Sequence, residues 1–378
     1  MSVANISENE VKELLDWPSI CEAIEQSLRA VCEIRVSDDQ PNHVQPTRMF
    51  TPALNGKGVL LSMPGCIGNY KLPKSSVNEP EKMFTSLGCK LVTSFPKNRE
   101  LNPPKPNILG NIFLFDDNSG ELKAIIQASE ITAWRTAAAS LVATNYLVVH
   151  MQWEFVQCSR LARFSYGIEP KSRAESLVAE LNQIRNQFKN VNLTIQCSDT
   201  VNECVRNADI IVTSTFSANP LVFRSMIKDN VHINAVGAGV NHHTELSEDI
   251  YTDSQTKIYV DAMSNAKSEL ATLNAPIVGE VGDIINGAKQ PPQSGIIIFH
   301  SMDIYTDSQT KIYVDAMSNA KSELATLNAP IVGEVGDIIN GAKQPPQSGI
   351  IIFHSMGMAI EDVAVAQSIY VKYQNKIQ

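Results

Sequence analysis

The sequence lacks any long apolar run. Its longest apolar stretches, such as residues 210–213 and 296–299, are far shorter than the roughly 20 residues that a membrane-spanning helix requires. Residues 1–15 carry acidic side chains and no apolar core, so they do not have the pattern of a secretory signal. We therefore expect a cytoplasmic protein with no membrane partner.

Paired cysteines are missing as well. The seven cysteines are scattered, without a C-x-x-C pair, which is typical of reduced thiols in a cytosolic protein. His242 and His243 are adjacent, but no His/Cys/Asp cluster at the spacing of metal ligands accompanies them. We expect the cysteines to be packing residues and the protein to have no metal site.

Positive charge is in deficit. The chain has 31 Lys and Arg against 40 Asp and Glu, a net charge of −9 at pH 7 and a pI near 5.4. Such a field repels a phosphate backbone, and no run of Lys and Arg appears that could follow one. The composition therefore argues against nucleic acid as a partner.

Apolar residues, in contrast, make up 43% of the 378 residues, enough for the cores of about two domains. In the first part, Ser7 and Glu10 precede apolar positions at helical spacing, the pattern of a capped helix. The expected elements are helices at residues 7–15, 18–30 and 131–147, strands at 58–63 and 89–93, and a hairpin of strands 111–115 and 122–126. The strands favour an antiparallel or mixed sheet.

From residue 172 onward, helical and strand patterns alternate. The expected helices are 173–190, 201–207 and 221–228, and the expected strands are 191–197, 209–215, 232–237 and 257–262. This rhythm is typical of βαβ units with a parallel sheet. We therefore predict an α/β protein in which a doubly wound parallel sheet of the nucleotide-binding type follows a mixed α+β region.

The chain also contains an identical repeat. Residues 249–302 recur letter for letter as residues 303–356, each copy being 54 residues long. Repeat families drift in sequence between units and usually need at least three units to build a core. An identical pair is instead typical of a recent duplication or of a splice or assembly error. Only the second copy leads into residues 357–362 and a final amphipathic helix, so the first copy is the expected insertion.

Three cations occur in contexts that suggest chemistry. Arg48 ends the run QPTR, Lys90 begins an apolar strand, and Arg135 lies in an alanine-rich helix. A lysine pointing inward from such a strand has its pKa depressed by desolvation, which suits it to proton transfer. A buried arginine needs an anionic partner, and a substrate carboxylate matches its planar fork. The alternative is that all three are surface or salt-bridged residues.

Five motifs, in this order, resemble the ornithine cyclodeaminase/mu-crystallin family, and among its members most closely the animal ketimine reductases. They are QPTR ending at Arg48, KLV beginning at Lys90, ITAWRTAA around Arg135, HINAVG at residues 232–237 and SMGMAIED at residues 355–362. The resemblance covers residues 1–149 and the chain from residue 172 onward, apart from the extra repeat.

The resemblance implies a homodimer that reduces cyclic imino acids with NADPH, or with NADH. Residues 1–130 with 354–378 would form the substrate and dimerisation domain, and 131–353 the Rossmann-like nicotinamide-binding domain. Arg48 and Arg135 would clamp the substrate carboxylate, while Lys90 would bridge to it or supply the proton to nitrogen. The same pocket can hold thyroid hormone in such proteins, so a non-catalytic small-molecule binding protein is the rival interpretation.

The resemblance also implies cofactor-binding residues. They are Asn111, Arg173, Thr215, Phe216, Val236 and Ser355. The cyclodeaminase branch has an acid just past the HINAVG strand, where this chain has Gly239, so ornithine cyclisation is the less favoured alternative.

One expected feature is missing. The family has a G-x-G-x-x-G/A turn between the Arg135 helix and residue 172, where backbone amides meet the cofactor pyrophosphate. Residues 150–170 here contain one glycine and no such turn. This abrupt loss of resemblance is typical of a frameshift or a mis-joined exon. A genuine loss of cofactor binding is the alternative, so the reductase is either intact in its chemistry or impaired. Gly237-Ala238-Gly239 is a weaker candidate for the loop.

Overall fold

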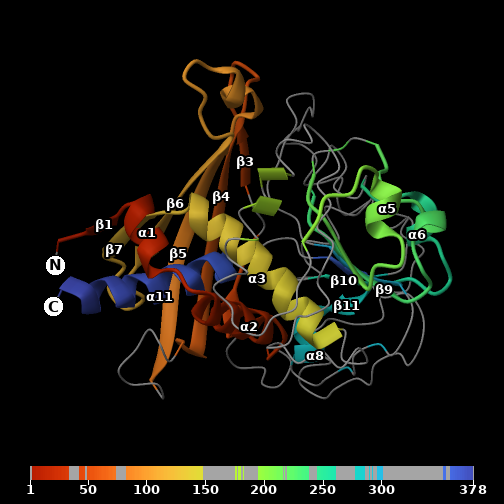
Figure 1. Cartoon of the computed structure of the whole chain (residues 1–378). Helices are drawn as coiled ribbons and strands as arrows, with labels where there is room; N and C mark the ends of the chain where they lie inside the picture. Colours follow the sequence, from red (N-terminus) through yellow and green to blue (C-terminus); the bar gives the residue numbers. More distant parts are fainter. Residues whose placement is uncertain are drawn as a thin grey trace.

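The computed structural model of the chain contains two β-sheets, each covered by helices (Figure 1). The structure describes residues 2–33, 42–46, 49–73, 82–147, 175–176, 178–179, 182, 195–215, 217, 219–237, 245–260, 277–285, 289, 292, 296–300, 352–354 and 358–377.

The chain begins with a short strand and two helices. Helix α1 (Glu8–Leu14) starts with the predicted capping box: the Glu10 N–H donates to Ser7 Oγ, and the Ser7 N–H donates to the Glu10 carboxylate. Helix α2 (Trp17–Glu33) follows and has a strongly amphipathic sequence. Both predicted helices are confirmed, because caps and apolar periodicity are local signals that the sequence displays directly.

The first sheet is mixed. Within the described residues it has seven strands, in the order β1-β7-β6-β5-β4-β2, with β3 paired to β4. They are β1 (Ala4–Ile6), β2 (His43–Val44), β3 (Met49–Pro52), β4 (Val59–Lys71), β5 (Met83–Ser94), β6 (Ile108–Phe115) and β7 (Leu122–Gln127). Only the β1–β7 pair among these is parallel. The predicted hairpin is confirmed as β6–β7, and its turn uses Gly120 at a φ of 73°.

Three helices pack on the inner face of this sheet: α2, α3 (Ser129–Leu147) and α11 (Ala359–Ile377), the last running across it (Figure 1). The first eleven residues of α11, from Ala359 to Ile369, are all buried. On the outer face, Leu60, Leu87 and Leu109 are 38%, 36% and 44% exposed. None of the described helices has both the length and the apolar character needed to cross a bilayer.

The second sheet is parallel throughout its described strands, in the order β13-β10-β12-β9-β8. They are β8 (Ile210–Thr213), β9 (Val231–Ala235), β10 (Lys257–Val260), β12 (Ile296–His300) and β13 (Ile352–His354); nearby lie α5 (Val201–Val205), α6 (Glu248–Tyr251), β11 (Ile277–Glu280) and α8 (Val281–Ile285).

Both faces of the parallel sheet are covered. Tyr259 and Ile297 belong to the same apolar core as α2, α3 and α8. Ile258 and Ile298, their neighbours in the same strands, belong to a second core with Ile250 of α6. Continuous apolar strands such as these are typical of parallel sheets with helices on both sides. The predicted fold class, a doubly wound α/β sheet plus a mixed α+β region, is confirmed.

Both copies of the repeat contribute strands to this sheet. The first copy supplies β10 and β12, and the second supplies β13. Strand β10 lies between the other two, and Ile258 pairs with both Ile298 and Ile352, which are the same residue of the two copies. The identical register continues one residue further along. The structure therefore holds this strand of the repeat twice. That the first copy is the insertion stays a prediction.

One predicted element in this region is wrong, and the described end of another is not formed. In place of the helix predicted at residues 221–228 are an isolated bridge at Val222 and a 3-10 turn, Arg224–Met226, because the backbone N–H groups of Leu221 and Val222 donate to the Glu245 carbonyl. Residues 195–197, the described end of the strand predicted at 191–197, are not in a strand. Strand propensity depends on a pairing partner, which a local pattern does not specify.

Deleting residues 303–356 tests whether the sheet needs both copies. Because the copies are identical, the shorter chain is the same whichever copy is removed. Its remaining strand can still pair with β9 and β10. We expect a folded protein whose midpoint of thermal unfolding, measured by circular dichroism, stays within about 4 °C of the full-length value, a shift worth about 1 kcal/mol. An unfolded or insoluble product would contradict this expectation.

Candidate active site

Two glycines seat the last helix against the first sheet. Gly65 of β4 and Gly88 of β5 are paired across the strands. A Cβ at Gly65 would lie 3.0 Å from the Ala359 Cβ, and one at Gly88 would lie 2.9 Å from Val363 Cγ2. Only residues without a Cβ permit such a close approach. The first turn of α11 therefore lies directly on the strand that carries Lys90.

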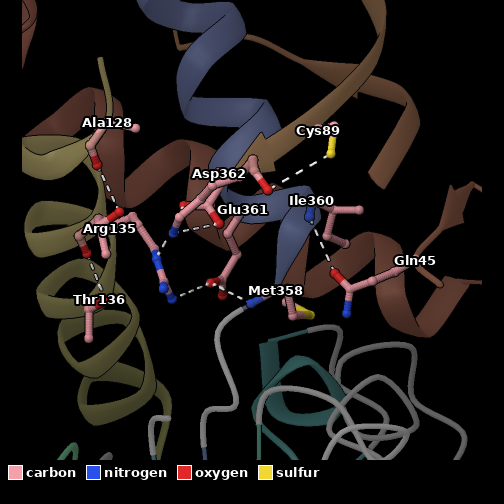
Figure 2. Close-up of polar contacts among 11 residues, drawn as sticks. Gln45, Cys89, Ala128, Arg135, Thr136, Met358, Ile360, Glu361 and Asp362 are labelled. Atoms are coloured by element: carbon pink, nitrogen blue, oxygen red, sulfur yellow. Dashed lines mark hydrogen bonds and ion pairs between the residues drawn. The ribbon is translucent and has the colours of Figure 1, made fainter. Parts of the chain in front are cut away.

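Four charged side chains meet at this contact, and Figure 2 labels three of them, Arg135, Glu361 and Asp362. Lys90 Nζ donates to both oxygens of Asp362, at 2.9 Å to Oδ1 and 3.1 Å to Oδ2. Arg135 of α3 contacts the same Asp362 Oδ1 through Nε at 3.4 Å and donates from Nη1 to Glu361 Oε2, also at 3.4 Å. Two of the sequence-predicted residues, Lys90 and Arg135, are thus brought together by two acids of α11.

Local sequence explains why Arg135 points into the molecule. Ile131, Ala138, Ala139 and Val142 are buried and share one face of α3 with it. The helical period places Arg135 in the middle of this stripe, one turn beyond Ile131. The same alternation along β5 places Lys90 on the inner face, where every second side chain is buried.

All four charged side chains are fully buried, with 0% exposure. Transfer of charges into a protein interior costs several kcal/mol per ion even when they are paired, so apolar residues would often be at least as stable here. Stability alone does not explain such a cluster, and groups of this kind concentrate at functional sites. The alternative that Lys90 and Arg135 are surface residues is wrong, and both are ion-paired.

The QPTR motif reaches the same place through its glutamine. Gln45 Oε1 accepts a hydrogen bond of 3.3 Å from the Ile360 N–H, next to Glu361 (Figure 2). An amide acceptor at this position satisfies one of the free N–H groups in the first turn of α11. Arg48, three residues further along, lies outside the described residues.

A second group of predicted residues gathers at the carboxyl ends of β8 and β9. The Val236 N–H donates to the Thr213 carbonyl at 2.7 Å. The N–H groups of Thr215 and Gly237 donate to the two oxygens of the buried Glu245 carboxylate, at 2.5 and 3.0 Å. Desolvation raises the pKa of Glu245, and these hydrogen bonds oppose that rise.

Gly237 has no room for a side chain, because a Cβ would lie 2.1 Å from the Glu245 carboxylate. The carboxylate already takes amide donors that a phosphate would need, so the Gly237-Ala238-Gly239 loop is disfavoured as a pyrophosphate site. Ala238 and Gly239 themselves lie outside the described residues.

The remaining predicted residues are not brought to the cluster. Asn111 is exposed on β6 and pairs with Leu91, whereas Lys90 pairs with the buried Ile112. Alternation along paired strands therefore puts Asn111 and Lys90 on opposite faces of the sheet. The other three cofactor residues, Arg173, Phe216 and Ser355, lie outside the described residues. No group of acids, histidines and cysteines that could hold a metal ion occurs in the described part of the chain.

Sequence reasoning missed three acids. Glu361 and Asp362 stand in the first turn of an apolar helix, where acids are common because they favour the helix dipole. Nothing local indicates that they are buried. Glu245 follows two histidines in what reads as a loop. For Glu361 and Asp362, the available signal in the sequence was two consecutive acids before a run of valine and alanine.

Comparison with known proteins agrees with the motifs. The model of the ornithine cyclodeaminase/mu-crystallin family matches residues 7–308 and 303–376. The chain is 29% identical over 294 residues to ketimine reductase mu-crystallin of Mus musculus, covering 74% of this chain and 87% of that protein. It is 26% identical to Delta(1)-pyrroline-2-carboxylate reductase of Bacillus cereus, covering 97% and 95% of the two chains.

The fold has counterparts among solved structures. The structure of Thermococcus litoralis Delta(1)-pyrroline-2-carboxylate reductase in complex with NADH and L-proline superposes with a TM-score of 0.64 and 20% sequence identity. The match covers 99% of this chain and 98% of that one. The chain therefore shares its fold with that protein.

Gly88→Ala tests the seat of α11. The new Cβ would lie 2.9 Å from the Phe113 backbone carbonyl, which cannot rotate away. We expect the free energy of unfolding in urea to fall by about 1–3 kcal/mol. Gly68→Ala, also on β4–β5, is the matched control, since its nearest neighbour would be Thr85 Oγ1 at 3.6 Å. Equal effects of the two substitutions would show that the close contact is unimportant.

Glu245→Gln tests the buried carboxylate. A carboxyl whose pKa is raised in the folded state contributes stability below its ordinary pKa of 4.5, and loses that contribution as the pH rises through the raised value. From pH 4 to pH 7, we expect the free energy of unfolding of the wild type to fall relative to that of the variant. The exposed Glu248→Gln controls for loss of one charge. If the free energy of unfolding of the wild type rose relative to that of the variant instead, the raised pKa of Glu245 in the folded protein would be refuted.

Proposed function

The chain belongs to the ornithine cyclodeaminase/mu-crystallin family, and on that premise we propose that it reduces the C=N bond of a cyclic imino acid, as a ketimine reductase. The observation that supports this function most directly is the buried cluster in which Lys90 and Arg135 share the carboxylate of Asp362. Two relatives of the chain are a ketimine reductase and a pyrroline-2-carboxylate reductase.

In the proposed reaction, Arg135 and Arg48 bind the substrate carboxylate. A guanidinium can hold a carboxylate with two parallel hydrogen bonds, which fixes the ring of the imino acid in orientation. Arg135 Nη1 already contacts Glu361 Oε2 at 3.4 Å. The substrate carboxylate would take the place of this acid on the guanidinium.

Lys90 is the proposed proton donor. The imine carbon accepts a hydride, the C=N π electrons form a new N–H bond, and the proton comes from Lys90 Nζ. The neutral amine then regains a proton from water. A protonated C=N is a better hydride acceptor, and a positioned general acid contributes about 10²–10⁴-fold to such a step. The contact with Asp362 favours the ammonium form that this role requires.

A nicotinamide cofactor supplies the hydride when bound. Thr215 and Val236 follow neighbouring parallel strands at the carboxyl edge, where doubly wound sheets bind nucleotides. These positions fit the nicotinamide end, and Arg173, Phe216 and Ser355 are proposed as further contacts. Asn111, on the opposite face of the first sheet from Lys90, is not proposed as one. Arg173 would favour NADPH over NADH by pairing with the 2′-phosphate.

We propose that the active form is a cytoplasmic homodimer, with residues 1–130 and 354–378 as the substrate and dimerisation domain and 131–353 as the cofactor domain. The outer face of the first sheet supports this, because Leu60, Leu87 and Leu109 are each more than one third exposed there. Leu60 and Leu109 both pair with Thr93 of β5 and so lie in one row of this face, whereas Leu87 lies six residues away along β5. The row with Leu60 and Leu109 is therefore the part of the face that we propose for the interface.

Titration with NADPH and NADH, followed by cofactor fluorescence, tests cofactor use. We expect saturable binding of both, with NADPH bound at least tenfold more tightly because a charge-assisted phosphate contact is worth about 1.5–3 kcal/mol. Absence of binding in a folded sample would exclude the reductase and favour the rival, a non-catalytic binding protein for aromatic acids of the thyroid hormone type.

Lys90→Ala tests the proton donor. We expect kcat for reduction of a cyclic imino acid such as pyrroline-2-carboxylate to fall by about 10³-fold. NADPH binding should stay within about threefold of wild type, since Lys90 lies on the first sheet. Retained turnover would remove Lys90 from the mechanism. Release of ammonia from ornithine by the wild type would instead favour the cyclodeaminase alternative.

A further inference from the structure

We propose that Asp362 is a positioning residue for this reaction: its carboxylate holds Lys90 and Arg135 in one fixed arrangement and keeps Lys90 protonated at neutral pH. The proposal rests on the function proposed above. It gives a role to the last residue of the SMGMAIED motif, which had none in the carboxylate clamp or the proton transfer.

The Asp362 carboxylate contacts both cations directly. Asp362 Oδ1 lies 2.9 Å from Lys90 Nζ and 3.4 Å from Arg135 Nε, so a single oxygen contacts both cations. Asp362 Oδ2 accepts a second hydrogen bond from Lys90 at 3.1 Å. Two cations this close repel each other in a buried site, and the shared carboxylate is what allows them to remain together. Movement of Asp362 would therefore displace both Arg135, which binds the substrate carboxylate, and Lys90, which donates the proton.

The described elements packed against Lys90 bring one other cation and two acids to it. The charged side chains that the described elements bring to it are Arg135 from α3 and Glu361 and Asp362 from α11. Its partners on β4 and β6 are the apolar Met63 and Ile112. The neighbouring inward positions of β5 are uncharged as well. Arg135 and burial both oppose the ammonium, and Asp362 is the acid in direct contact with it.

A positioning residue must itself be held in place, and contacts of the first turn of α11 hold Asp362. Its helix turn is held by the close approach of Gly65 and Gly88 to α11 and by the hydrogen bond from the Ile360 N–H to Gln45. A catalytic group needs to be held within about 0.5 Å of its productive position, which is easier on packed helices and strands than on loops. Asp362 fulfils this condition for two groups at once.

The test is the pH dependence of imine reduction by Asp362→Asn. The substitution is isosteric and removes the charge, so Lys90 should lose its proton at lower pH. We expect the alkaline limb of the kcat profile to move by about one pH unit or more toward lower pH, and kcat at pH 7 to fall at least about 100-fold. A profile that coincides with that of the wild type would overturn the proposal.

Glu361→Gln is the matched control, since Glu361 is equally buried and contacts Arg135. Glutamine keeps an acceptor for the Met358 N–H but no longer competes with the substrate carboxylate as an anion. We expect KM to fall at least about threefold, with the alkaline limb in its wild-type position. If Asp362→Asn and Glu361→Gln moved the alkaline limb equally, the shift would follow from the loss of any buried negative charge, and the positioning role of Asp362 would be refuted.

Asp362→Glu covers the case in which Asp362→Asn does not fold. It retains the charge but moves the carboxylate by one methylene. We expect the alkaline limb to stay within about half a pH unit of wild type while kcat falls at least about tenfold. Wild-type kcat in this variant would overturn the positioning role. Absence of imine reduction in the wild type itself would instead be a failure of the proposed function.

Discussion

The contact of one aspartate with two cations is the constraint on which the rest of the site depends. Asp362 lies on the last helix, Lys90 on the first sheet and Arg135 on the helix that leads toward the second sheet. Lys90 and Asp362 are 272 residues apart in the chain. Because none of the three charges tolerates burial alone, the ends and the middle of the chain have to meet at this point.

Small residues make that meeting possible. The paired glycines Gly65 and Gly88 leave a shallow seat into which the first turns of α11 fit, and eleven consecutive residues of the helix are buried there. A helix that is buried on all sides needs partners for its first N–H groups, and Gln45 accepts one of them. The proposed catalytic role and the structural role thus fall on the same turn of helix.

The parallel sheet, in contrast, accommodates a change as large as a duplication. Strand β10 has two edges, and the same strand of the two copies pairs with each of them in the same register. A parallel strand can be added at an edge without disturbing the pairs already made, and long insertions cost little in loop entropy. The site on the first sheet is therefore insulated from the irregularity, because α11 follows the second copy and still reaches its seat.

The sequence by itself determined what local patterns can encode: the capped first helix, the β6–β7 hairpin, the alanine-rich helix with Arg135, the alternating elements of the parallel sheet, and the motifs that identify the family. It did not determine the helix wrongly expected at residues 221–228, because long-range hydrogen bonds to Glu245 override local preference there. Nor did it indicate Glu361 and Asp362 as the partners of Arg135 and Lys90. Acids in a first helical turn look alike whether exposed or buried, and only tertiary packing decides which of them meets a buried cation.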